Sequence, residues 1–261
     1  MAWEIWERSL VPALLANCGS WVNISKKALK TLNETQSLYC RLIYSCPDST
    51  PIPALRGEAG LLNFEQQIMC EKICLVTRMM NQDNEEDSYA QEILKEQIAM
   101  DWVGLTKEVF KFCEEIGLPN PCEEFLDRKE VSQAIMFSHL KTLKEEYSME
   151  KLKHLKNTDI RYMQKYMTMA SLENARLEFR YRIRMLDNRA DMGKRYSFKY
   201  CPHCPAGRQD GVVENIQHWL ECAAYKVLRV GVDPENELED RVRYIRRVQL
   251  LREQLEKMVG R

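Results

Sequence analysis

Residues 201–222 read CPHCPAGRQDGVVENIQHWLEC, and this stretch decides how the C-terminal part of the chain folds. Cys201 and Cys204 are separated by two residues, and His218 and Cys222 follow after thirteen more, at a spacing of four. Two thiols this close fit one tight turn, and two residues four apart project from the same face of a helix. Zinc takes four such ligands in a tetrahedron, so the pattern predicts a zinc site made of these four side chains.

The loop between the two pairs contains Gly207 and Gly211, so it can bend back and close the site. Because protein side chains supply all four ligands, we expect one structural Zn2+ and no open position for catalysis. His203 lies between the two cysteines and is expected to point away from the ion. The alternative is that these are unrelated thiols, because the chain has ten Cys in total. Six others lie in or beside apolar helical patterns and are interpreted as buried, reduced side chains, namely Cys18, Cys40, Cys70, Cys74, Cys113 and Cys122.

The rest of the chain reads as helical. It has only ten Gly and nine Pro in 261 residues, which favours long helices over many short strands. Apolar residues recur at helical spacing behind N-cap residues such as Ser25, Asn63 and Ser171. We therefore predict a mostly α fold, a multi-helix bundle with a small C-terminal CCHC zinc knuckle and a long terminal helix. The predicted helices cover 3–14, 25–43, 54–58, 64–79, 88–100, 102–116, 171–185 and 233–258, and residues 128–156 are expected to form one or two more.

The terminal helix is expected to begin at Asp233 as the N-cap, with Pro234 in its first turn. An apolar stripe follows at 4-3-4-3 spacing over residues 244–258 and consists of Tyr244, Val248, Leu251, Leu255 and Met258. A narrow stripe of this kind packs either on the body of the protein or on a second chain. Residues 244–258 are therefore a candidate contact for a protein partner.

Charge is unevenly distributed, although the net charge is only −1. Residues 1–150 contain 15 Lys and Arg against 24 Asp and Glu, a net of −9, and residues 151–261 contain 23 against 15, a net of +8. A polyanion partner would therefore bind the C-terminal half. The alternative is two solvated faces of opposite sign that attract each other. The acidic run 81–88 is a candidate linker or surface loop.

The stretch 161–208 is the most suggestive of nucleic acid, with 11 Lys and Arg against 4 Asp and Glu and seven interleaved Tyr and Phe. Arginines neutralise phosphates and aromatic rings stack on unpaired bases, so this composition favours single-stranded RNA or DNA. On a helix, Arg176, Arg180 and Arg184 would form a row along one face. The alternative is that the arginines are a solvated face or pair with the acids of 83–87. The candidate nucleic-acid-binding residues are Arg176, Arg180, Arg184, Lys194, Arg195, Lys199 and Arg208.

Several segments resemble the C-terminal end of non-LTR retrotransposon polyproteins, in which a zinc knuckle follows the reverse transcriptase. The segments that carry this resemblance are SLENAR (171–176), FRYRIRM (179–185), the Cys201–Cys204 pair and ENIQHWLECAAY (214–225). Residues 8–80 also look like the region after that enzyme's palm, through LVPALL (10–15), CGSW (18–21) and PALRGEAGLL (53–62). The resemblance implies a thumb-like helical region 1–82, a helical connector 83–160 and a basic zinc-knuckle region 161–261.

The catalytic part of that family is missing. The palm of a reverse transcriptase carries a Tyr/Phe-x-Asp-Asp turn, and no Asp-Asp pair occurs in this chain. We therefore expect no enzyme activity, but binding of template or element RNA or DNA by an accessory region. The alternative function is a helical protein-interaction module in which zinc is purely structural. No stretch is apolar enough to span a membrane and Met1–Arg8 lacks the features of a signal peptide, so an intracellular location, nuclear or cytoplasmic, is expected.

Overall fold

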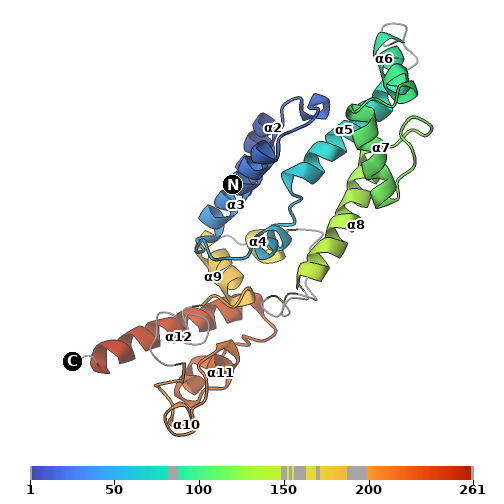
Figure 1. The fold of residues 1–261 in the computed structure, drawn as a ribbon. Helices are drawn as coiled ribbons and strands as arrows, with labels where there is room; N and C mark the ends of the chain where they lie inside the picture. The colour runs from blue at the N-terminus through green and yellow to red at the C-terminus, as the bar shows by residue number, and fades with distance from the viewer. Residues whose placement is uncertain are drawn as a thin grey trace. The chain divides into compact units, whose positions relative to one another are not determined.

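Helices dominate the structure. The computed structural model describes residues 2–81, 88–147, 152, 155, 163–168, 171–186 and 199–259. In these residues regular structure is helical, apart from one isolated antiparallel bridge between Tyr200 and Val213 (Figure 1). The predicted mostly α fold is confirmed.

The chain forms two compact units. The N-terminal unit comprises Met1–Ile43, Pro51–Met149 and Asp159–Tyr162, and the C-terminal unit comprises Tyr44–Thr50, Glu150–Thr158 and Met163–Arg261. One apolar core joins residues of the predicted regions 1–82 and 83–160. The predicted acidic loop 81–88 falls largely on residues 82–87, which lie outside the described residues.

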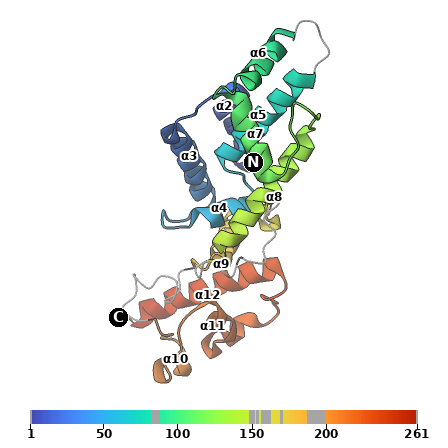
Figure 2. The ribbon, with the colours of Figure 1, turned by 45° about the vertical axis from the view of Figure 1, so that its right-hand side comes forward.

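The N-terminal unit is organised around one long helix, α5 (Phe64–Asn81), which contacts η2, α6, α7 and α8 (Figure 2). Its core is fully buried at Ile73, Val76, Val109 and Val131. The other helical elements of the unit are α1 (Ala2–Ile5), the π-helical η1 (Trp6–Leu10), α2 (Val11–Leu14), η2 (Cys18–Ser20), α3 (Lys26–Tyr44), α4 (Ile52–Ala59), α6 (Ser88–Ala99), α7 (Leu105–Ile116) and α8 (Arg128–Tyr147).

Local sequence signals account for the ends of these helices. The Ser25 hydroxyl accepts a backbone N–H at 3.1 Å in the first turn of α3. At the start of α5, the Asn63 carboxamide accepts the Gln66 N–H at 2.8 Å, while the Gln66 carboxamide accepts the Asn63 N–H at 3.2 Å. This reciprocal capping box satisfies donors that a helix leaves unpaired. Gly60 and Gly117 end α4 and α7 with φ of 64° and 75°, a conformation that favours glycine.

The C-terminal unit packs small helical elements against its long terminal helix. α12 (Leu238–Val259) contacts α9 (Leu172–Arg182) and η6 (Ala223–Arg229). The remaining elements are η5 (Lys165–Thr168), α10 (Pro205–Gln209) and α11 (Ile216–Glu221). Tyr44 also belongs to this unit and stacks on Phe179, with ring centroids 3.8 Å apart.

α9 is shorter than predicted, which matters for the row of arginines. Ser171 caps its N-terminus as expected, but the helix ends at Arg182 instead of residue 185. Arg184 has a left-handed φ of 54°, and the Met185 N–H donates to the Arg180 carbonyl at 2.8 Å. This arrangement is a Schellman-type helix end, which terminates the helix. Arg184 therefore does not continue the helical row of Arg176 and Arg180.

The start of α12 also differs from the prediction. Asp233 caps a separate turn, in which its carboxylate accepts the Asn236 N–H at 3.2 Å and its carbonyl accepts the Glu237 N–H at 3.0 Å. The helix itself begins only at Leu238. The signal for a cap was therefore correct, but the capped element is a turn. Of the segment 128–156, predicted as one or two helices, α8 covers Arg128–Tyr147, and most of the remainder lies outside the described residues.

Candidate metal centre

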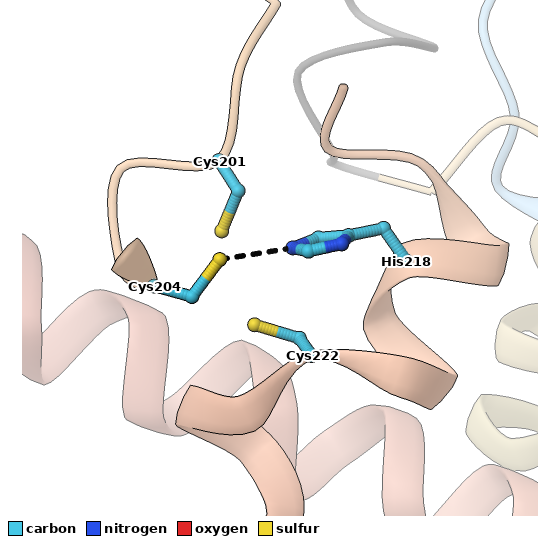
Figure 3. Close-up of side chains that lie close together, drawn as sticks. All are labelled: Cys201, Cys204, His218 and Cys222. Carbon is cyan, nitrogen blue, oxygen red and sulfur yellow. Dashed lines mark hydrogen bonds between the residues drawn. The ribbon is translucent and has the colours of Figure 1, made fainter. Parts of the chain in front are cut away.

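Three short elements bring the four predicted ligands together. Cys201 follows the bridge formed by Tyr200, Cys204 is the N-cap of α10, and His218 and Cys222 stand in and directly after α11. The four ligand atoms lie within 4.8 Å of one another, and Cys204 Sγ lies 3.5 Å from His218 Nε2 (Figure 3). Among the described residues, this is the one group of three or more His, Cys, Asp or Glu that could hold a metal ion.

The turn after Cys204 depends on a glycine. The Gly207 N–H donates to Cys204 Sγ at 3.2 Å, which orients the thiol. A Cβ added at Gly207 would lie 2.0 Å from the Cys201 carbonyl oxygen. Only glycine, which has no Cβ, therefore fits at position 207. Its absence of a side chain lets the backbone of α10 approach Cys201, and this approach brings the two thiols together.

A short two-stranded loop sets the position of α11. The Cys201 N–H donates to the Val212 carbonyl at 2.9 Å, and the Glu214 N–H donates to the Lys199 carbonyl at 2.8 Å. Asn215 then caps α11 by accepting the His218 N–H at 2.7 Å. The cap fixes where the helix begins, and with it the face on which His218 lies.

The donor set fits a tetrahedral zinc ion. With Zn–S near 2.3 Å and Zn–N near 2.0 Å, the ligand atoms of such a site are about 3.5–3.8 Å apart. The three thiols are buried and His218 is half-buried, so the site is shielded from competing water. A hydrogen bond from Cys222 lowers the pKa of the Cys201 thiol to about 4, while burial opposes this shift. The pKa of Cys222 is correspondingly raised by the shared proton and by burial. At least one thiolate, the form that binds metals, is thus favoured even before an ion enters.

A buried polar network lies beneath the metal centre and ties it to α12. Arg252 Nε lies 3.2 Å from Glu214 Oε1, and these side chains are 5% and 0% exposed. The Arg252 guanidinium also lies over the Trp219 ring, 5.3 Å from its centroid. The Tyr225 hydroxyl donates to Glu214 Oε1 at 3.4 Å, and the Tyr244 hydroxyl donates to the Trp219 carbonyl. Sequence reasoning did not identify Glu214 and Arg252, because no local pattern pairs residues 38 positions apart.

The apolar stripe of α12 is used mainly within its own unit. Tyr244 and Val248 are buried in the core that also contains Trp219. Leu255 is half-buried and Met258 is 64% exposed. The stripe therefore packs on the body of the protein over its first half, and only its C-terminal end remains available to a partner.

The candidate nucleic-acid-binding residues in and after α9 differ in their surroundings. Arg180 Nη2 donates to the Ser45 carbonyl at 2.7 Å, Arg176 is half-buried, and Arg184 is exposed beyond the end of α9. Lys194 and Arg195 lie outside the described residues.

Lys199 and Arg208 are exposed beside the metal centre. Arg208 Nε donates to the Pro202 carbonyl at 2.8 Å, and Tyr200, next to Lys199, is 49% exposed. The sequence neighbours of the metal ligands therefore include exposed basic and aromatic groups.

Comparison of the chain with protein-family models, with curated proteins and with solved structures gives no match. The family resemblance therefore remains a prediction. Among the described residues, no helix combines the length and the apolar character needed to cross a bilayer.

Proposed function

We propose that the C-terminal unit is a zinc-stabilised module that binds single-stranded nucleic acid, as an accessory region of a retroelement reverse transcriptase without its catalytic palm. The observation that carries this proposal is the cluster of Cys201, Cys204, His218 and Cys222, whose rim presents Lys199, Tyr200 and Arg208. The sequence resemblance to retroelement polyproteins is consistent with it.

Zinc has a structural role in this proposal. Four protein ligands leave no position for a substrate, so the ion fixes the conformation of residues 201–222. The short loop thereby holds its rim residues at defined positions without a large apolar core of its own.

The rim supplies the two interactions that single strands require. Tyr200, which is 49% exposed, offers an aromatic face on which an unpaired base can stack. Lys199 and Arg208 are exposed cations before and within the same loop and can neutralise phosphates. Neither contact reads base edges, so binding is expected to depend weakly on sequence. The chain lacks an Asp-Asp pair, so we propose no polymerase step.

The proposal is tested with a labelled single-stranded oligonucleotide and fluorescence anisotropy. Tyr200→Ala should weaken binding by about 1–3 kcal/mol, and Lys199→Gln should reduce the slope of log K against log salt by about one unit. Lys257→Gln, on an exposed position of α12, is a control with the same change of charge. Unchanged affinity and salt slope in both rim variants, with zinc content preserved, would contradict the proposal.

A further inference from the structure

The apolar side chains of α6 are distributed in an unusual way. Leu94 is its one large apolar side chain that is buried, at 3% exposure. Tyr89 and Ile93 are 77% and 51% exposed, although both are large and apolar. The helix lies at one end of the N-terminal unit, beside α5 and α7 (Figure 1). Its outward face is therefore apolar as well as its inward face.

Tyr89, Ile93 and Met100 form an exposed stripe on one side of the helix, interrupted by the exposed Glu96 between Ile93 and Met100. Tyr89, Ile93 and Met100 lie at positions i, i+4 and i+11, which share one side of a helix. The Met100 N–H donates to the Glu96 carbonyl at 2.9 Å, so the helical turn extends to this residue. Trp102 and Val103, which follow directly, are also more than half exposed. Large exposed apolar side chains gathered at one end of a unit are typical of an interaction site.

The stripe has an acidic flank. With about 100° between successive residues, Glu92 and Glu96 fall on the same side of Ile93. Both are exposed, and neither carboxylate forms an ion pair or hydrogen bond with any residue that the structure describes. The charge of the surrounding sequence has the same sign, since residues 1–150 carry a net −9.

We propose that this face of α6 binds an amphipathic helix of a partner protein whose apolar face is bordered by Lys or Arg. The apolar side chains of the partner would cover Tyr89, Ile93 and Met100, and its basic residues would pair with Glu92 and Glu96. A second copy of the chain fits less well. A two-fold axis that pairs two α6 helices antiparallel would bring the acidic flank of one against the acidic flank of the other. The inference is independent of nucleic-acid binding, because it concerns the other unit.

The test measures binding of the full-length chain to a labelled amphipathic peptide of Leu and Lys, with a twin peptide in which Glu replaces every Lys. The Lys peptide should bind and the Glu peptide should not. Ile93→Asn and Glu92→Lys/Glu96→Lys should each weaken binding by about tenfold. Their thermal unfolding should match that of the wild type, because all three side chains are solvent-exposed.

Two control variants separate binding at this site from non-specific effects of net charge and of exposed apolar surface. Glu123→Lys/Glu124→Lys changes the net charge equally at another exposed site, and Leu38→Asn removes an exposed apolar side chain from α3. Equal weakening in the controls would overturn the proposal. So would a fall in thermal stability of Ile93→Asn, which would place the stripe in the core. Sedimentation that shows a dimer, dissociated by Ile93→Asn, would also overturn it in favour of a second copy.

Discussion

Substitution of Gly207 by alanine tests the geometry of the metal centre directly. The added Cβ would lie 2.0 Å from the Cys201 carbonyl oxygen and 2.6 Å from the Cys201 Cβ. Carbon atoms in contact are separated by about 3.5–4.0 Å, so the α10 turn must move by about 1 Å or more. Overpacking of this kind costs about 1–3 kcal/mol. The displaced N–H also loses its hydrogen bond to Cys204 Sγ, which adds about 1 kcal/mol.

The overpacking and the lost hydrogen bond both lower the affinity of the site for metal. Together these two costs amount to about 2–4 kcal/mol, which corresponds to a decrease in zinc affinity of about 30-fold to about 1,000-fold. Competition with a chromogenic chelator measures the zinc affinity, and circular dichroism measures the helix content, which should change little. Gly104→Ala is the matched control, because Gly104 has an extended φ of −169° and an added Cβ would meet only the flexible Gln97 side chain, at 3.3 Å. If Gly207→Ala bound zinc as tightly as the wild type, close packing of the α10 turn on Cys201 would not be required for metal binding.

Three further predictions follow from the same structure. Protein purified without added metal should contain about one equivalent of zinc, and Cys204→Ser should lose it; elemental analysis that finds no metal in the wild type would contradict the site. Glu214→Gln removes the buried charge partner of Arg252, which keeps only the partly exposed Glu256 at 3.8 Å, and should destabilise the C-terminal unit by up to about 3–5 kcal/mol. Glu214→Leu/Arg252→Met should cost much less, as measured by denaturant unfolding. Burial and the nearby Arg56 lower the pKa of His139 to about 4 from an ordinary value of 6.5. Between these two pH values the unfolded chain therefore binds more protons than the folded chain. The free energy of unfolding should fall by up to about 3 kcal/mol as pH decreases from about 6.5 to about 4. If His139→Gln lost as much stability over this pH range as the wild type, His139 would not be the cause.

The metal ligands could be predicted from the sequence because their signal is local. The two-residue gap between Cys201 and Cys204 encodes a turn, and the four-residue step from His218 to Cys222 encodes one helical face. The same holds for caps such as Asn63, whose partner stands three residues away. Interactions across a few residues depend on backbone geometry, which is the same in every protein.

The parts that were not predicted depend on contacts between distant residues. Arg252 resembles any other arginine of a basic helix, and only packing reveals that it is buried beside Glu214. Segment 44–50 joins the C-terminal unit through the stacking of Tyr44 on Phe179 and the bond from Arg180 to the Ser45 carbonyl. No periodicity in the sequence encodes such pairs, so the boundaries of the two units could not be derived from it.

Arg176, Arg180 and Arg184 do not form the predicted straight row, and this affects the proposed mode of nucleic-acid binding. A straight row along α9 would bind phosphates without any help from the metal centre. Arg180, however, donates to the Ser45 carbonyl, and Arg184 lies beyond the C-terminal end of α9 in a left-handed conformation. Lys199, Tyr200 and Arg208 are exposed and belong to or border residues 201–222, whose conformation the metal would fix, and the Arg208 guanidinium is itself held by the Pro202 carbonyl. Under the proposed function, zinc and nucleic acid therefore bind with positive coupling, because the ion orders the residues that contact the strand, and each ligand must strengthen the binding of the other by the same factor.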